Sequence, residues 1–348
     1  MPGHPLFCCP PLIRFTRLGR LLTLCACLPG ALWGNLLDPE SGQPILHNHR
    51  PTEYLGHPQI FDVTQDSQGF IYLANVQGII QYDGVRWVHH VAPLTFTYEI
   101  EATDDGRIWV SSFGEIGYFE AQGNEGKMAF TSLLPRLPES IRDVDRGGDL
   151  VVFEDAVYYT TPQALIRIRG DEIYHWISPE ARFGGELNIV DGELYWVAEG
   201  QELRRIEGDE TPLVTTDAKL LNGRKIRGID RPGRAPLWVI GERGVFELIG
   251  DQPAFQRVAG PLNDLIQTTR INDIERLDAE TFAVATSQHG VIIADNDGQT
   301  IRRLDRNSGL ADNAILALFT DRDDGLWAGM NSGLVQIAHN NAVTIFDG

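Results

Sequence analysis

The sequence predicts an all-β fold, a seven-bladed β-propeller of four-stranded antiparallel blades preceded by a signal peptide. Short segments rich in β-branched and aromatic residues recur at intervals of 37 to 45 residues. The 36 glycines and 19 prolines favour many tight turns, and no stretch of 12 or more residues keeps a helical period. A repeat of this length with four strands per unit is typical of a propeller blade.

The repeat is clearest in "NSGLADNAILALFTDRDDGLWAGMNSGLVQI" (307–337), where an apolar run leads to an acidic turn, Trp327 and a second glycine turn. The same order can be followed upstream, and the turn before the aromatic strand contains glycine in six of the seven units. The residue equivalent to Trp327 falls at Tyr72, Trp109, Val151, Tyr195, Trp238 and Ala283. Six residues later a glycine recurs as Gly78, Gly244 and Gly333, which predicts a tight hairpin.

These units divide the chain into seven predicted blades within residues 60–348. Their expected bounds are 60–95, 96–139, 140–185, 186–224, 225–270, 271–313 and 314–348. Residues 35–59 lie outside the count, and we expect them to close the ring by pairing with the last blade around "PTEYLG". Closure matters because a complete ring leaves no long unpaired sheet edge.

The first 34 residues are typical of a secretory signal peptide. Arg14, Arg17 and Arg20 precede the apolar run 21–33, which is too short to span a membrane. All four cysteines lie in this leader, so a mature chain starting near Asn35 has no thiol, which suits an oxidising compartment. We therefore expect a periplasmic protein. A lipoprotein box ending at Cys27 is the alternative, and it would tether the chain to the membrane.

The charge balance excludes one class of partner. The formal net charge is −19, and removal of the leader with its three arginines makes it −22. Such a surface repels nucleic acid and anionic lipid. We expect no nucleic-acid partner.

Two stretches carry a family resemblance. "GLADNAILALFTDRDDGLWAGMNSGLVQI" resembles the two-component regulator propeller repeat, and "YLGHPQIFDVTQDSQGFIYLANVQGIIQYDGVRW" (54–87) resembles the opening blade of the same sensors. The resemblance is good in blades one and seven, looser in five and six, and mainly one of spacing in two to four. It implies a periplasmic input module that binds a small ligand for a histidine kinase or diguanylate cyclase.

In that family an Ig-like domain, a membrane helix and a cytoplasmic output domain follow the propeller. This sequence ends at Gly348 within its seventh repeat, whereas the sensors often carry two propellers. The chain is then either a fragment of a longer receptor or a solitary sensor with a separate signalling partner. A dimer would form through the region downstream.

Catalytic motifs and metal-ligand patterns are weak. The sequence has no nucleophile elbow, zinc-protease motif or P-loop, so we lean towards a non-enzymatic protein and expect no cofactor. "HNH" (47–49) lacks a third ligand, and "TDRDDG" and "ADNDG" lack the spacing of a calcium loop, so we expect no metal. A propeller lyase or glycosidase needs two carboxylates facing one cleft. The candidates near the innermost strands are Glu99, Glu101, Asp143, Asp273 and Glu275.

Binding at the central channel is the leading hypothesis for function. Residues at the start of the innermost strands would line one mouth of this channel, and arginine, asparagine and tyrosine there suit a hydroxylated or anionic small ligand, such as a sugar or glycan fragment. The predicted ligand-binding residues are Tyr98, Arg142, Asn188, Arg227, Asn272 and Asn313. These side chains could instead hydrogen-bond strand ends. The alternative functions are a propeller lyase or glycosidase and a periplasmic interaction scaffold.

Overall fold

The computed structural model describes residues 44–123, 126–144, 148–177, 185–198, 202–215, 226–230, 237–241, 244–249 and 254–338. They belong to one compact unit, Glu40–Gly348. The predicted signal peptide (1–34) lies outside the described residues.

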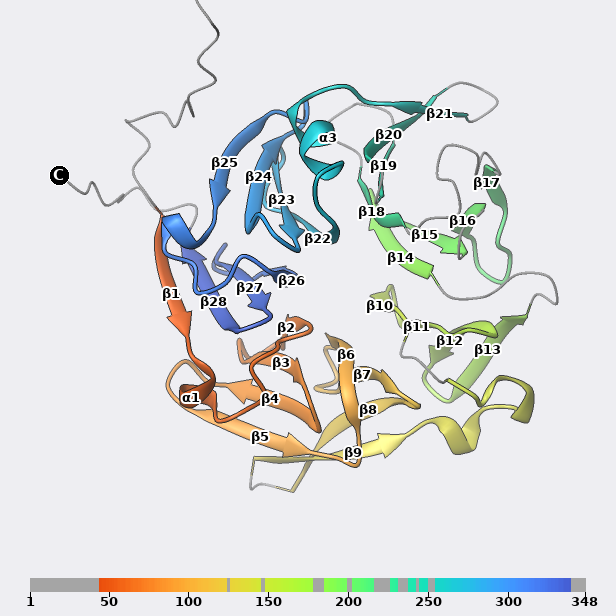
Figure 1. Cartoon of the computed structure of the whole chain (residues 1–348). Helices are drawn as coiled ribbons and strands as arrows, with labels where there is room; N and C mark the ends of the chain where they lie inside the picture. The colour runs from red at the N-terminus through yellow and green to blue at the C-terminus, as the bar shows by residue number, and fades with distance from the viewer. Residues whose placement is uncertain are drawn as a thin grey trace, which may run out of the picture. The chain divides into compact units, whose positions relative to one another are not determined.

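Seven four-stranded antiparallel sheets follow one another along the chain (Figure 1). The first three are β2 (Val63–Gln65), β3 (Ile71–Asn75), β4 (Gly78–Tyr82) and β5 (Trp87–Val91); β6 (Thr95–Ala102), β7 (Ile108–Phe113), β8 (Glu115–Gln122) and β9 (Lys127–Ser132); and β10 (Leu150–Phe153), β11 (Ala156–Thr160), β12 (Ala164–Arg169) and β13 (Glu172–Ile177).

The remaining sheets continue the pattern. They are β14 (Gly185–Val190), β15 (Glu193–Ala198), β16 (Glu202–Ile206) and β17 (Leu213–Thr215); β18 (Ile226–Asp230), β19 (Trp238–Gly241), β20 (Gly244–Ile249) and β21 (Ala254–Arg257); β22 (Ile271–Arg276), β23 (Thr281–Thr286), β24 (Val291–Asp295) and β25 (Thr300–Leu304); and β26 (Ile315–Thr320), β27 (Leu326–Met330), β28 (Gly333–Ala338) and β1 (Ile45–His49). The predicted seven-bladed propeller is confirmed.

The first strand of each blade lies at the centre of the ring. Neighbouring first strands contact one another from β2 and β6 around to β26, and Figure 1 shows them nearest the common centre. Helices are short in the described part of the chain: α1 (Pro51–Tyr54), α3 (Pro261–Ile266) and three single 3-10 turns, η1 (Leu134–Arg136), η2 (Glu139–Ile141) and η3 (Arg306–Ser308).

The ring closes through β1, which is the outermost strand of the last blade. β1 pairs antiparallel with β28, from Ile45 opposite Ala338 to His49 opposite Leu334. The Asn48 side chain adds two bonds to the loop before β26, donating to the Gly309 carbonyl at 2.9 Å and accepting from the Ala311 amide at 3.1 Å. The expectation of a closing strand around "PTEYLG" was wrong: Pro51 suits the first turn of a helix, and these residues form α1, so the strand lies just before them.

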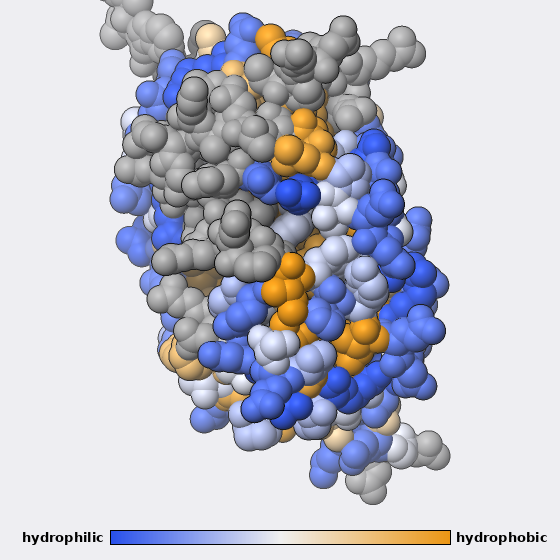
Figure 2. Space-filling view, turned by 90° about the vertical axis from the view of Figure 1, so that its right-hand side faces the viewer, coloured by the Kyte–Doolittle hydropathy of each residue, from blue (hydrophilic) through white to orange (hydrophobic). Residues whose placement is uncertain are grey.

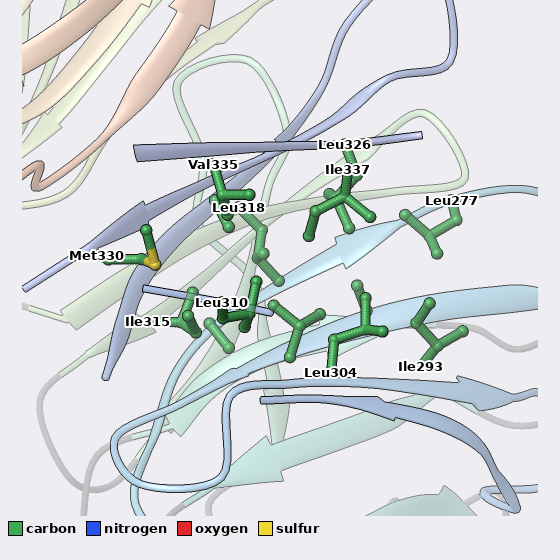
Figure 3. Close-up of a cluster of buried hydrophobic side chains, with 14 residues drawn as sticks. Leu277, Ile293, Leu304, Leu310, Ile315, Leu318, Leu326, Met330, Val335 and Ile337 are labelled. Atoms are coloured by element: carbon green, nitrogen blue, oxygen red, sulfur yellow. The ribbon is translucent and has the colours of Figure 1, made fainter. Parts of the chain in front are cut away.

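The hydrophobic core lies between blades. In Figure 3 the side chains of Leu318 and Leu326 from the seventh blade point towards Ile293 and Leu304 of the sixth. Corresponding buried clusters lie between other neighbouring blades, such as the one that joins Trp109 of the second to Tyr159 of the third. Each blade is thus stabilised by burial against both neighbours.

The repeated aromatic residue is bound to its own acidic turn. Trp327 Nε1 donates to Asp321 Oδ2 at 2.7 Å, and Tyr72 donates to Asp66 Oδ2 at 3.0 Å. The other oxygen of Asp321 accepts two backbone amides of the turn, from Asp323 and Gly325. The turn that resembled a calcium loop therefore uses both carboxylate oxygens of Asp321 within the protein, as an Asx turn does.

Gly78 provides a test of the hairpin that the repeat predicts. Its φ is +138°, and a Cβ there would lie 2.2 Å from the carbonyl oxygen of His90. We expect Gly78→Ala to lower the free energy of unfolding by roughly 2–4 kcal/mol, since it combines strain with overlap on the next strand. Gly114, with φ +73° and nothing within 4 Å of a Cβ, is the control. Gly114→Ala should cost only about 1 kcal/mol in urea denaturation, and equal losses in the two variants would contradict this account.

Candidate functional site at the mouth of the central channel

Carboxylates line the centre of the ring. In five of the seven blades a carboxylate occupies the same position of the innermost strand. It directly precedes an apolar residue that pairs with the second strand of the blade. These residues are Asp62, Glu99, Asp149, Glu186 and Asp273. Glu101 and Glu275 follow two residues further along their strands, and side chains two apart share one face of a strand.

The three aspartates of this set join neighbouring blades. Asp62 Oδ1 accepts the amide of Val63 at 2.8 Å in its own strand, and Oδ2 accepts the amide of Ile100 at 2.8 Å in the next blade. The same arrangement recurs for Asp149 with Leu150 (3.0 Å) and Leu187 (2.5 Å), and for Asp273 with Ile274 (2.7 Å) and Leu318 (2.7 Å). We call this arrangement the aspartate clamp. It supplies acceptors for edge amides that would otherwise lack a partner strand.

Burial and mutual repulsion change the protonation of the channel. Burial raises the pKa of Glu101, Asp149 and Glu275 to about 7 in each case. The pKa of Glu99 lies well above its usual range, first because of burial and then because of the negative charges around it, beginning with Asp62. Part of the ring therefore holds protons near neutral pH.

The predicted catalytic carboxylates only partly meet. Glu99, Glu101, Asp273 and Glu275 lie in this channel, whereas Asp143 is exposed in the connection before β10. Sequence reasoning missed Asp62, Asp149 and Glu186, although aligning the repeats at the first strand would have found them. Among the described residues no cluster of three or more His, Asp and Glu side chains is arranged to hold a metal ion.

Of the six predicted ligand-binding residues, two asparagines are used within the fold. Asn272 Nδ2 donates to the Ile315 carbonyl at 2.6 Å, and Asn313 Oδ1 accepts the Arg306 amide at 2.8 Å. Both therefore hold the junction of blades six and seven.

The other four lie apart from that junction. Asn188 is half-buried in β14, and Arg142 is exposed at the end of η2, where it donates to the Leu137 carbonyl at 2.8 Å. Arg227 lies in β18, and its side chain is outside the described part of the chain. Tyr98 is half-buried in β6, near the start of that strand. The anion site built on the two arginines stays a prediction.

Tyr98 belongs to an aromatic triad with Phe61 and Phe96. The ring centroids lie 5.6 Å apart for Phe61 and Tyr98, 6.1 Å for Phe61 and Phe96, and 6.4 Å for Phe96 and Tyr98. Phe61 precedes β2 and the other two begin β6. Because every blade has the same strand order, these strand starts lie at one mouth of the channel.

The backbone at Phe96 is unusual. Its φ is +56°, in the left-handed region that bulky residues rarely adopt, and its side chain is 38% exposed. The pairing of β6 with β7 shifts register on both sides of Thr97, which places the ring at an irregular strand start. No sequence signal points to this conformation.

Two surface pockets lie away from the channel. One of about 320 Å³, between blades three and four, contains Arg167, Arg169 and Arg205, each bound to a neighbouring carboxylate. Figure 2, which faces the side of the ring carrying β13 and β17, shows hydrophobic side chains in small groups between hydrophilic ones.

The second pocket, of about 250 Å³, contains His47 beside the turn Asp321–Gly325. His49 of the "HNH" stretch is 4% exposed and stacks on Trp327, with ring centroids 5.8 Å apart. Burial lowers the pKa of His49.

Comparisons with known proteins identify the fold. No family model matches the sequence, and no curated protein matches it significantly. Among solved structures, the extracellular domain of the hybrid two-component system BT4673 from B. thetaiotaomicron matches 87% of this chain at 16% identity and a TM-score of 0.63. The corresponding domain of BT3049 from the same organism matches 84% at 15% identity and a TM-score of 0.65.

The chain spans about two fifths of the length of these sensor domains, 40% and 42% respectively. Virginiamycin B lyase from Staphylococcus aureus is similar too, with 84% of this chain and 99% of that chain covered at 12% identity and a TM-score of 0.62. At such identities the likeness establishes the propeller fold. In the described part of the chain no helix is long and apolar enough to cross a membrane.

The channel carboxylates predict a pH dependence of stability. Glu275 has a pKa of about 7 when folded against an ordinary value of 4.5, so its protonated form favours folding below about pH 4.5 and that stabilisation is lost as the pH rises through 7. We therefore expect the free energy of unfolding to fall between pH 5 and pH 8. Glu275→Gln retains an acceptor for the Thr320 amide. It should reduce the loss of unfolding free energy between pH 5 and pH 8 by roughly 1–3 kcal/mol.

Exposed Glu139 in η2 supplies the control, since Glu139→Gln should leave the slope unchanged. Denaturant titrations at a series of pH values measure all three proteins. A wild-type free energy of unfolding that rises from pH 5 to pH 8 would contradict this prediction, because ionisation of the channel carboxylates would then not destabilise the fold.

Proposed function

We propose that this chain is the periplasmic input module of a bacterial signalling system. It binds a small molecule at the mouth of its central channel and passes this event to a histidine kinase or diguanylate cyclase. The output is either fused downstream or a separate protein, and dimerisation belongs to that output. Export through the 1–34 leader is part of the proposal.

The observation that carries the proposal is the combination of the sensor-type repeat with an aromatic, partly exposed channel mouth. Blades one and seven carry the motifs of the two-component regulator propeller, and the solved sensor domains share the fold. The mouth presents rings from two blades rather than a smooth surface. A ligand that touches side chains of several blades can sum small contacts into useful affinity.

An enzyme is the second candidate, and the channel carboxylates favour it. Glu101 and Glu275 have pKa values of about 7, which suits a general acid or base, and a propeller lyase shares the fold. However, Asp62, Asp149 and Asp273 are bound to backbone amides of two strands, as structural groups are. On the side shown in Figure 2 the visible hydrophobic groups are small and separated, so this side offers no broad apolar surface to a scaffold partner where its side chains are visible.

A thermal-shift screen of the purified protein against sugars, glycan fragments, organic acids and organic cations tests the proposal. A true ligand at one hundred times its Kd should stabilise the fold by about 2.7 kcal/mol, and Tyr98→Ala should remove that gain. Arg227→Ala should remove it only for anionic or hydroxylated ligands. Arg169→Ala, in the pocket between blades three and four, is the control and should retain it.

Each outcome of the screen has a meaning. A ligand whose effect survives Tyr98→Ala but not Arg169→Ala would move the site to the outer pocket. Conversion of a screened compound, followed by mass spectrometry, would favour the enzyme. A complete lack of stabilising compounds would count against a small-molecule sensor.

A further inference from the structure

We propose that the ligand of the channel mouth is an organic cation, a substituted ammonium group on a small apolar body, held by the triad of Phe61, Phe96 and Tyr98. This rests on the proposed function and names its ligand class.

The triad has the geometry of an aromatic corner. The planes of Phe96 and Tyr98 lie within 18° of each other, and Phe61 meets them at 83° and 69°. Two walls are thus parallel and the third is nearly perpendicular. Ring faces carry a negative electrostatic potential, and several faces around one point attract a desolvated cation. Recognition of quaternary ammonium groups is the characteristic use of such an arrangement.

Exposure leaves the corner accessible. Phe96 is 38% exposed, and Phe113, which ends the neighbouring strand β7, is 47% exposed. An exposed ring at a strained backbone position is costly on two counts, through its contact with water and through its φ of +56°. Burial of Phe96 beneath a ligand would recover the first cost.

The carboxyl groups next to the aromatic triad favour a positively charged ligand. Asp62 directly follows Phe61 and Glu99 directly follows Tyr98, and both carboxyl groups belong to the channel ring. Burial, and then the neighbouring carboxyl groups, raise the pKa of both groups, and a cation at the mouth would favour their ionised forms. The chain as a whole has a net charge of −19, which steers cations towards it and anions away.

A sugar finds fewer partners at this mouth. Hydroxyl groups need side-chain donors and acceptors, and Asn272 Nδ2 and Asn313 Oδ1 are bonded to the backbone at the junction of blades six and seven. Arg142 is exposed and bonded to the Leu137 carbonyl. The described side chains of the mouth thus offer mainly rings and carboxyl groups, together with the Tyr98 hydroxyl.

The test compares choline with 3,3-dimethylbutanol, its neutral carbon analogue of the same shape, by isothermal titration of the purified protein. We expect choline to bind about five- to thirtyfold more tightly than dimethylbutanol. Phe96→Ala and Phe96→Gly should each weaken choline binding by a similar factor. Tyr174→Ala, an exposed ring on the outermost strand β13, should not change it.

The two Phe96 variants separate binding from folding. Both remove the ring, but glycine also relieves the positive φ, so Phe96→Gly should melt at a higher temperature than Phe96→Ala while binding choline as poorly. If Phe96→Ala does not fold, choline binding by Phe96→Gly still tests the role of the ring.

Several results would overturn the inference: equal affinities for choline and dimethylbutanol, a choline affinity unaffected by Phe96→Gly, or no binding of choline or phenyltrimethylammonium at millimolar concentration. If a neutral sugar or an organic acid binds instead and depends on Tyr98 or Arg227, the cation is refuted while the proposed sensor function stands.

Discussion

The aspartate clamp is the interaction on which the rest of this structure depends. In each blade the first strand is an edge strand, with no further strand beside it towards the centre of the ring. The backbone amides on its inner edge, which face the centre of the ring, would remain unpaired if the channel were apolar. Asp62, Asp149 and Asp273 each accept one amide from their own strand and one from the next blade. Packing between blades holds the ring together, and these carboxylates set the register of one blade against the next.

This solution gathers negative charge in the middle of the protein. The cost is visible in the raised pKa values of Glu101, Asp149 and Glu275, which all lie near 7. Protons taken up by the ring relieve the repulsion, and the accessible mouth lies directly above it. The feature that builds the channel therefore also determines which ligands can approach it. Of the carboxylates that the sequence suggests as a catalytic pair, Asp273 is structural, because it accepts one amide from each of two blades.

The number and order of the blades could be predicted from the sequence because their signals are local. The Asx turn of Asp321 and the ring of Trp327 lie six residues apart and bind each other, and Asp66 and Tyr72 do the same in the first blade. The closing strand was harder to place. "ILHNH" carries no turn signal of its own, and "PTEYLG", the expected closing strand, forms the helical turn that Pro51 begins.

The sequence led to only one residue of the aromatic triad at the channel mouth. Tyr98 was predicted because strand starts line a channel, yet its partner Phe61 comes from the preceding blade and meets it only because β2 and β6 lie side by side. The positive φ of Phe96 depends on a register shift that no residue type announces. Asn272 and Asn313 have the right type for ligand binding, but Asn272 Nδ2 and Asn313 Oδ1 are bonded to the backbone at the blade junction. Whether such a side chain bonds the backbone or a ligand depends on its tertiary contacts.

Residue-resolved amide hydrogen exchange in an Asp273→Ala variant tests the clamp most directly. The account predicts that the Leu318 amide, which donates to Asp273 across the blade boundary, exchanges far faster than in the wild type. The Ile100 and Leu187 amides, bound to Asp62 and Asp149, should keep their protection in the same sample. Unchanged exchange at Leu318, or an equal loss of protection at all three amides, would contradict the claim that each aspartate individually joins two blades.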